Sequence, residues 1–186
     1  MRVVEDATRT VEKQIVPGKE LCERIIMTAL DEKGMATFPL PEQKAKEMVA
    51  TIEKNFDAID EVVIGTAFVV METAAKDKVD EMVGLVQFFL TTYAGMVLSK
   101  RMTEYGDATL SRLVSEDPKD WQRALLECAR SGSIREDAFK ERMQITMEDL
   151  LFSFPVGSYS QRLFAEFIKK FEEEGVQAFG QMTSST

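Results

Sequence analysis

MVGLVQFFLTTYAGMVLS, residues 82–99, contains no charged side chain. In the whole chain of 186 residues, 30 % of the residues are charged. A helix that is apolar on every side is normally surrounded by other parts of a protein or by lipid. We therefore predict an all-α, single-domain bundle of about seven to eight helices around a buried central helix near residues 78–104.

Lipid is the alternative environment for this stretch. Eighteen residues at about 1.5 Å each span about 27 Å, close to the shortest helix that crosses a bilayer. The stretch is only moderately apolar, because it includes Gly84, Gln87 and Tyr93, and charged residues flank both of its ends. A buried core helix fits these features better than a membrane span, and we expect no membrane insertion.

Apolar residues recur at helical spacing along most of the remaining chain. We expect Pro17–Gly18 to separate a first helix from a second, and Gly175 to end the last long helix, which begins after Ser158. No repeat or convincing domain boundary is visible. The sequence therefore predicts a single all-α domain over residues 1–180 and a disordered tail over residues 181–186.

Polar residues mark the expected helix starts. Asp57 with Asp60, and Asp77 with Asp80, are typical of N-terminal caps, and Asp117–Pro118 is a further start signal. Two segments have the spacing of a capping box. These are residues 133–136 (SIRE) and 158–161 (SYSQ).

Histidine is absent from the chain. Its absence removes the commonest general base and the commonest metal ligand, and it excludes Ser–His and Cys–His catalysis. The ten glycines never cluster as a phosphate-binding loop, and paired-cysteine metal motifs are missing. We therefore expect a non-enzyme with no catalytic residue, no cofactor and no metal; a carboxylate-dependent enzyme is the less favoured alternative.

The net charge of −9 disfavours binding to nucleic acid, because phosphate groups require a positive surface. It leaves open a basic protein partner. Cys22 and Cys128 lie in apolar helical patterns, so we expect buried free thiols rather than a disulfide. The N-terminus lacks the apolar run of a secretory signal, and a cytoplasmic location is the simplest expectation.

The last long helix has an apolar face that is broader than one core requires. Such a face is typical of a partner surface, most often a second copy of the chain. We therefore predict a protein-interaction or regulatory domain, acidic and self-associating as a homodimer. The candidate interface residues are Leu163, Phe164, Phe167, Ile168 and Phe171.

Binding of an apolar small molecule between the central helices is the alternative function. Methionine and phenylalanine side chains line adaptable apolar pockets, although they fill cores more often. The chain contains 12 Phe and 11 Met. The candidate pocket residues are Phe68, Met71, Phe88, Phe89, Tyr93 and Met96.

Overall fold

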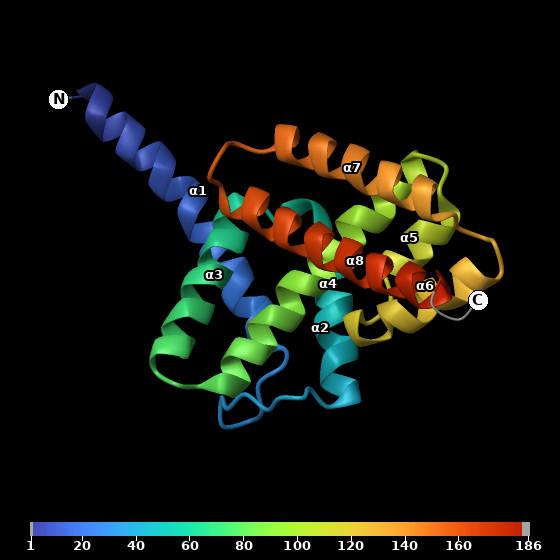
Figure 1. Ribbon diagram of the computed structural model, residues 1–186. Helices are drawn as coiled ribbons and strands as arrows, with labels where there is room; N and C mark the ends of the chain where they lie inside the picture. The colour runs from blue at the N-terminus through green and yellow to red at the C-terminus, as the bar shows by residue number, and fades with distance from the viewer. Residues whose placement is uncertain (1, 184–186) are drawn as a thin grey trace. The chain divides into compact units, whose positions relative to one another are not determined.

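The computed structural model describes the backbone of residues 2–183 and the side-chain environment of residues 15–182 (Figure 1). All regular structure in this part of the chain is helical, so the all-α prediction is confirmed. The α-helices are α1 (Arg2–Met27), α2 (Glu42–Lys54), α3 (Glu61–Lys76), α4 (Asp80–Glu104), α5 (Ala108–Val114), α6 (Trp121–Arg130), α7 (Glu136–Ser153) and α8 (Tyr159–Thr183). Two short 3-10 helices lie at Phe56–Ala58 and Pro118–Asp120.

The helices pack as two compact units, Met1–Tyr93 and Ala94–Thr186. The boundary falls inside α4 and not in a loop. Compact units need not fold separately, so a single domain over residues 1–180 stays a prediction. Of the predicted tail, residues 181–183 belong to α8, and residues 184–186 lie outside the described part of the chain.

In the first unit, α1 packs against α2 and α3. The prediction of a break at Pro17–Gly18 is wrong, because both residues lie inside α1. Gly18 is buried, and a Cβ atom at this position would lie only 2.7 Å from the Val62 side chain at the start of α3. The missing side chain thus permits the close approach of α1 and α3, and this packing outweighs the poor helix propensity of both residues.

Two predicted features of the first unit are confirmed at atomic detail. Asp60 caps α3, because its side chain accepts hydrogen bonds from the backbone N–H groups of Val62 and Val63; Asp57 lies in the preceding 3-10 helix. Cys22 is a buried free thiol. Burial, together with the nearby Glu23 carboxylate, raises the pKa of the Cys22 thiol to about 12, so the thiol remains protonated and unreactive near neutral pH.

In the second unit, α6 and α7 both pack against α8. Trp121 of α6 makes edge-to-face contacts with Phe167 and Phe171 of α8, each with ring centroids 5.0 Å apart. Phe139 of α7 contacts Phe171 at 5.8 Å and Phe179 at 5.6 Å. These five rings join the three helices into one aromatic cluster.

Gly175 lies inside α8, so the prediction that it ends the last helix is wrong. A Cβ atom at Gly175 would lie within 2.3 Å of the Phe139 ring. The absence of a side chain at Gly175 therefore lets α7 approach α8 closely. Packing against Phe139 outweighs the tendency of glycine to interrupt a helix.

By length and composition, α4 could cross a bilayer. Among the described residues, one helix meets this criterion. Of its most apolar window, 44 % is buried inside the protein. The core helix of a soluble protein has the same properties, so this single helix is weak evidence for a membrane span.

Replacing Phe171 by alanine is expected to destabilise the second unit by about 3–5 kcal/mol, because the ring is fully buried against Trp121 and Phe139. Denaturant unfolding followed by tryptophan fluorescence measures the change. Met35→Ala is the matched control, since Met35 is 63 % exposed, and should change stability by less than about 0.5 kcal/mol. Equal effects of the two substitutions would contradict the packing described.

Gly175→Ala and Gly180→Ala are expected to change stability in opposite directions. The new methyl group at position 175 displaces Phe139 and costs about 1–3 kcal/mol. At position 180, a Cβ atom meets nothing within 4 Å, and alanine should stabilise α8 by up to about 1 kcal/mol. Thermal unfolding of both variants checks the signs; stabilisation by Gly175→Ala would contradict the close contact.

Candidate functional site

The candidate interface residues on α8 lie in the protein interior. Leu163, the most exposed of the five, is only 7 % exposed, and Phe167 and Phe171 belong to the aromatic cluster. Phe164 stacks on Phe154 with ring centroids 5.1 Å apart. The broad apolar face of α8 is therefore accounted for by packing within the chain, because both α6 and α7 pack against α8.

The candidate pocket residues are divided between core and surface. Phe68, Phe89 and Tyr93 are buried, and the Tyr93 hydroxyl donates a hydrogen bond to the Ile59 carbonyl at 3.1 Å. Met71, Phe88 and Met96 are half-buried. Met96 belongs to the second compact unit and the other five belong to the first. The buried members thus read as core residues of the first unit.

Among residues 15–182, the most exposed large apolar side chains lie in the last turn of α7 and in the connection that follows it. Phe152 is 89 % exposed and Val156 is 94 % exposed. Both residues belong to the segment 150–161 (LLFSFPVGSYSQ), which we call the α7–α8 corner. Neighbouring residues in the same segment point inward, since Leu150 is buried and Phe154 stacks on Phe164.

Hydrogen bonds fix the shape of the α7–α8 corner. The Ser158 hydroxyl accepts from the backbone N–H of Gln161 at 3.1 Å, which confirms the predicted cap. The Gln161 amide oxygen accepts from the backbone N–H of Gly157 at 2.9 Å, and its amide nitrogen donates to the Leu151 carbonyl at 3.2 Å. One side chain thus connects the end of α7 to the start of α8. The other predicted capping box does not form, because Arg135 is the N-cap of α7 and makes no side-chain cap hydrogen bond.

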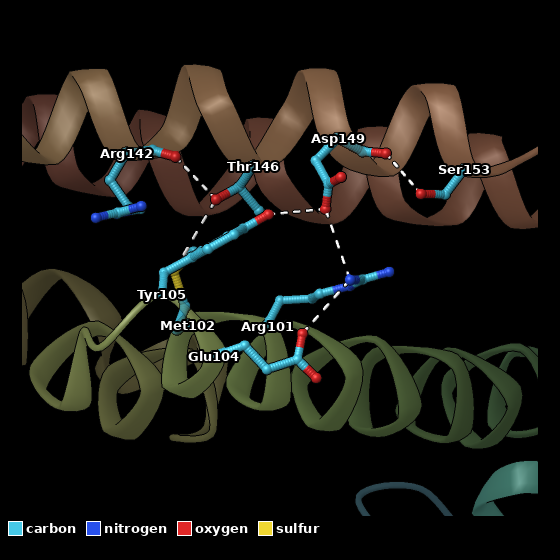
Figure 2. A network of polar contacts seen from close by, with 8 residues as sticks. All are labelled: Arg101, Met102, Glu104, Tyr105, Arg142, Thr146, Asp149 and Ser153. Carbon is cyan, nitrogen blue, oxygen red and sulfur yellow. Dashed lines mark hydrogen bonds and ion pairs between the residues drawn. The ribbon is translucent and has the colours of Figure 1, made fainter.

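A polar network holds α7 against the end of α4 within the second unit (Figure 2). The Tyr105 hydroxyl donates to the Asp149 carboxylate at 2.7 Å. Arg101 lies 3.9 Å from the same carboxylate and 3.4 Å from the Glu104 carboxylate. Ser153, which belongs to the α7–α8 corner, donates to the backbone carbonyl of Asp149 at 2.7 Å.

The other end of this network is built around Arg142. Its guanidinium lies 5.0 Å from the centre of the Tyr105 ring, and its Nε lies 3.9 Å from the Asp107 carboxylate. Thr146, which is fully buried, donates to the Arg142 carbonyl at 2.8 Å and reaches the Met102 sulfur at 4.0 Å. Charges of both signs are paired across the network, which suits a structural role in orienting α7.

The network also bears on the carboxylate-enzyme alternative. Two carboxylates, those of Glu104 and Asp149, converge on Arg101 (Figure 2). Both are ion-paired to the same guanidinium, and neither lines one of the two clefts described below. Among the residues that the structure describes, no group of three metal-ligating side chains could hold a metal ion.

Two open clefts lie on the second unit. The first, of about 570 Å³, has Ile134, Phe179 and Met182 among its lining residues. Its charged lining residues are paired with one another, Arg135 with Asp137 and Lys140 with Glu136. The second cleft, of about 590 Å³, lies between α7 and Glu172 of α8 and has a mainly acidic rim.

Sequence reasoning missed Phe152 and Val156. Phe152 falls outside the apolar stripe of α7, which contains Phe139, Met143 and Leu150, so helical periodicity indicates that it faces outward. Val156 follows the end of α7 and Pro155, where helical periodicity no longer applies. The α7–α8 corner is also free of charged residues. A large apolar residue outside the stripe, in a segment without charges, is the sequence signal that could have identified this surface.

Comparisons of this chain with protein-family models, with curated proteins and with solved structures found no match.

Asp149→Asn is expected to lower the pKa of Tyr105. Burial and the hydrogen bond to the Asp149 carboxylate raise this pKa above its ordinary value, because ionisation would place two negative charges side by side. The stabilising effect of the pair is therefore present below the unfolded-state pKa of about 10 and is lost as the pH rises through the folded-state pKa. Spectrophotometric titration of tyrosine measures the shift, and Tyr105→Phe assigns it.

Tyr93 provides an internal control in the same titration. Burial, with the nearby Asp60 and Asp57 carboxylates, raises the pKa of Tyr93 to about 12. This value should not change in the Asp149→Asn variant. A shift of both tyrosines, or of neither, would contradict the network in Figure 2.

Proposed function

We propose that this protein is a non-catalytic, self-associating protein-interaction or regulatory domain. The observation that carries the proposal is the exposure of Phe152 and Val156 at the α7–α8 corner. Exposed large apolar side chains within one short segment are typical of sites where another protein binds. The proposal keeps the predicted homodimer and moves its surface from the buried face of α8 to this corner.

The rigidity of the corner favours binding. Gln161 and Ser158 hold the backbone, and Phe154 anchors it by stacking on Phe164. Phe152 and Val156 are therefore presented from a fixed support. A surface that is already ordered loses little conformational entropy when it binds, so more of the free energy of apolar burial contributes to affinity.

Charge indicates why a second copy is the proposed occupant. Two copies of a chain with a net charge of −9 repel each other over most of their surfaces. The twelve residues of the α7–α8 corner carry no charge, so copies that meet there approach with the least repulsion. In a two-fold symmetric interface the same patch contacts itself, which pairs apolar side chains with apolar side chains.

The absence of histidine supports binding and not catalysis as the mode of action. A cytoplasmic location belongs to the same proposal. It is supported by Cys22 and Cys128, which are both free thiols, as expected in a reducing compartment.

The double variant Phe152→Ser/Val156→Ser tests the proposal. Burial of each side chain in the dimer contributes about 1.5 kcal/mol or more to the free energy of association. Its loss should therefore raise the dimer dissociation constant at least about tenfold. Sedimentation equilibrium over a range of protein concentrations measures this constant. Circular dichroism should show unchanged helical content, because both side chains are exposed in the single chain.

Met35→Ser/Val69→Ser is the matched control, since both side chains are large, apolar and more than half exposed in the first unit. This variant should associate like the wild type. A wild-type chain that is monomeric at every concentration, or a corner variant that associates as well as the control, would refute self-association through the corner.

A further inference from the structure

Gln161 holds both ends of the segment that carries the two exposed apolar side chains. Its amide nitrogen donates to the Leu151 carbonyl at 3.2 Å, and its amide oxygen accepts from the backbone N–H of Gly157 at 2.9 Å. Leu151 directly precedes Phe152, and Gly157 directly follows Val156. One side chain thus fastens the intervening segment at its two ends, an arrangement that we call the Gln161 clamp.

The clamp differs from an ordinary capping box. In a capping box, the glutamine side chain bonds the backbone N–H of the capping serine. Here the N–H of Ser158 donates to the Pro155 carbonyl at 3.1 Å. The glutamine oxygen accepts from the preceding residue, Gly157. The glutamine nitrogen bonds the Leu151 carbonyl, which lies in the last turn of α7 and has no partner within that helix. The start of α8 is thereby joined to the end of α7.

The positions of the two exposed side chains depend on this clamp. Gln161 is half-buried and directs its amide group at the backbone of its own chain. Phe152 and Val156 stand at the two ends of the clamped segment, and between them Phe154 stacks on Phe164. Without the glutamine amide, the segment keeps the anchor in its middle and loses the two hydrogen bonds beside its exposed side chains.

We propose that Gln161 is the positioning residue of the self-association surface. By fastening residues 152–156 at both ends, it holds Phe152 and Val156 in the arrangement that a second copy binds. The inference rests on the proposed self-association through the α7–α8 corner. It assigns control of the affinity to a residue that acts through the two contact residues.

Self-association amplifies the effect of such a clamp. If only chains with an ordered segment bind, the apparent dissociation constant rises as the ordered fraction falls. Both copies in a dimer must be ordered, so this fraction enters the dissociation constant squared. If loss of the clamp leaves about one third of the chains ordered, the dissociation constant rises about ninefold.

Gln161→Met removes both hydrogen bonds and keeps the length of the side chain. The dimer dissociation constant, measured by sedimentation equilibrium, should rise about fivefold or more, with unchanged helical content by circular dichroism. Gln144→Met is the matched control, because the Gln144 amide lies on the exposed surface of α7 and donates to the Glu148 carboxylate at 3.0 Å. The control should associate like the wild type.

Ile134→Val measures the effect of lower stability alone. It removes one methyl group from a buried residue that precedes α7. Its dissociation constant should stay close to that of the wild type. A rise as large as that of Gln161→Met would show that association follows the general stability of the second unit, and would overturn the positioning role.

Gln161→Glu tests whether the clamp acts through its hydrogen bonds. A protonated carboxyl group can donate to the Leu151 carbonyl and accept from Gly157, as the amide does, whereas a carboxylate cannot donate. The corner contains no charged residue, and the next residue, Arg162, is paired with Glu166 at 2.9 Å. The new carboxyl group should therefore have a pKa near the ordinary value of about 4.3.

The Gln161→Glu variant should associate more weakly than the wild type at pH 7 and approach the wild type at pH 4. The quantity compared is the ratio of the two dissociation constants at each pH, because acid also changes the charge of the whole chain. The same ratio for Gln161→Met should not recover in acid. Circular dichroism at both pH values checks that each chain is folded.

Hydrogen exchange tests the clamp apart from association. In a solution dilute enough for the chain to be monomeric, Gln161→Met should raise deuterium uptake in a peptide that covers residues 150–161. Uptake in a peptide that covers residues 162–179 of α8 should stay the same. Unchanged uptake in residues 150–161 would overturn the clamp, as would a Gln161→Glu variant that shows no recovery in acid.

Failure of this proposal is distinguishable from failure of self-association through the corner. If Phe152→Ser/Val156→Ser weakens the dimer and Gln161→Met does not, the positioning role alone is refuted. If the wild-type chain is monomeric at every concentration, both proposals are refuted, whatever the exchange experiment shows.

Discussion

The contact of the Phe139 ring with Gly175 determines the arrangement of the second unit. The ring occupies the space where a side chain would otherwise stand, so α7 lies close against α8. From this point the aromatic cluster extends through Phe171 to Trp121 and joins α6 to the same helix. The α7–α8 corner, the surface with a proposed function, connects the same two helices.

Local signals in the sequence predicted the starts of α3 and α8 correctly, whereas Asp77 is the C-cap of α3 and not an N-cap of α4. Asp60 caps α3 and Ser158 caps α8. Both caps can be predicted from the sequence, because the side-chain oxygen bonds a backbone N–H group only two or three residues further along the chain. The uncharged stretch at residues 82–99 likewise identified α4, since a long helix without charge requires burial.

The errors have a common physical cause. Gly18 and Gly175 both have the local properties of helix breakers, and both lie inside helices where a partner side chain occupies the position of the missing Cβ atom. The same lack of tertiary information made the apolar face of α8 look too broad for one core. Trp121 and Phe139, distant in sequence, cover that face. Periodicity indicates which face is apolar and not how many helices cover it.

The two cysteines have a practical consequence that follows from their positions. Cys22 is buried in the first compact unit, and Cys128 is buried in the second, where the Arg112 guanidinium lies 3.7 Å from its sulfur. A buried thiol reacts with an alkylating reagent only when its surroundings open. The rates at which the two thiols are alkylated therefore report on opening of each unit separately, so the natural chain carries one chemical probe of local unfolding in each half.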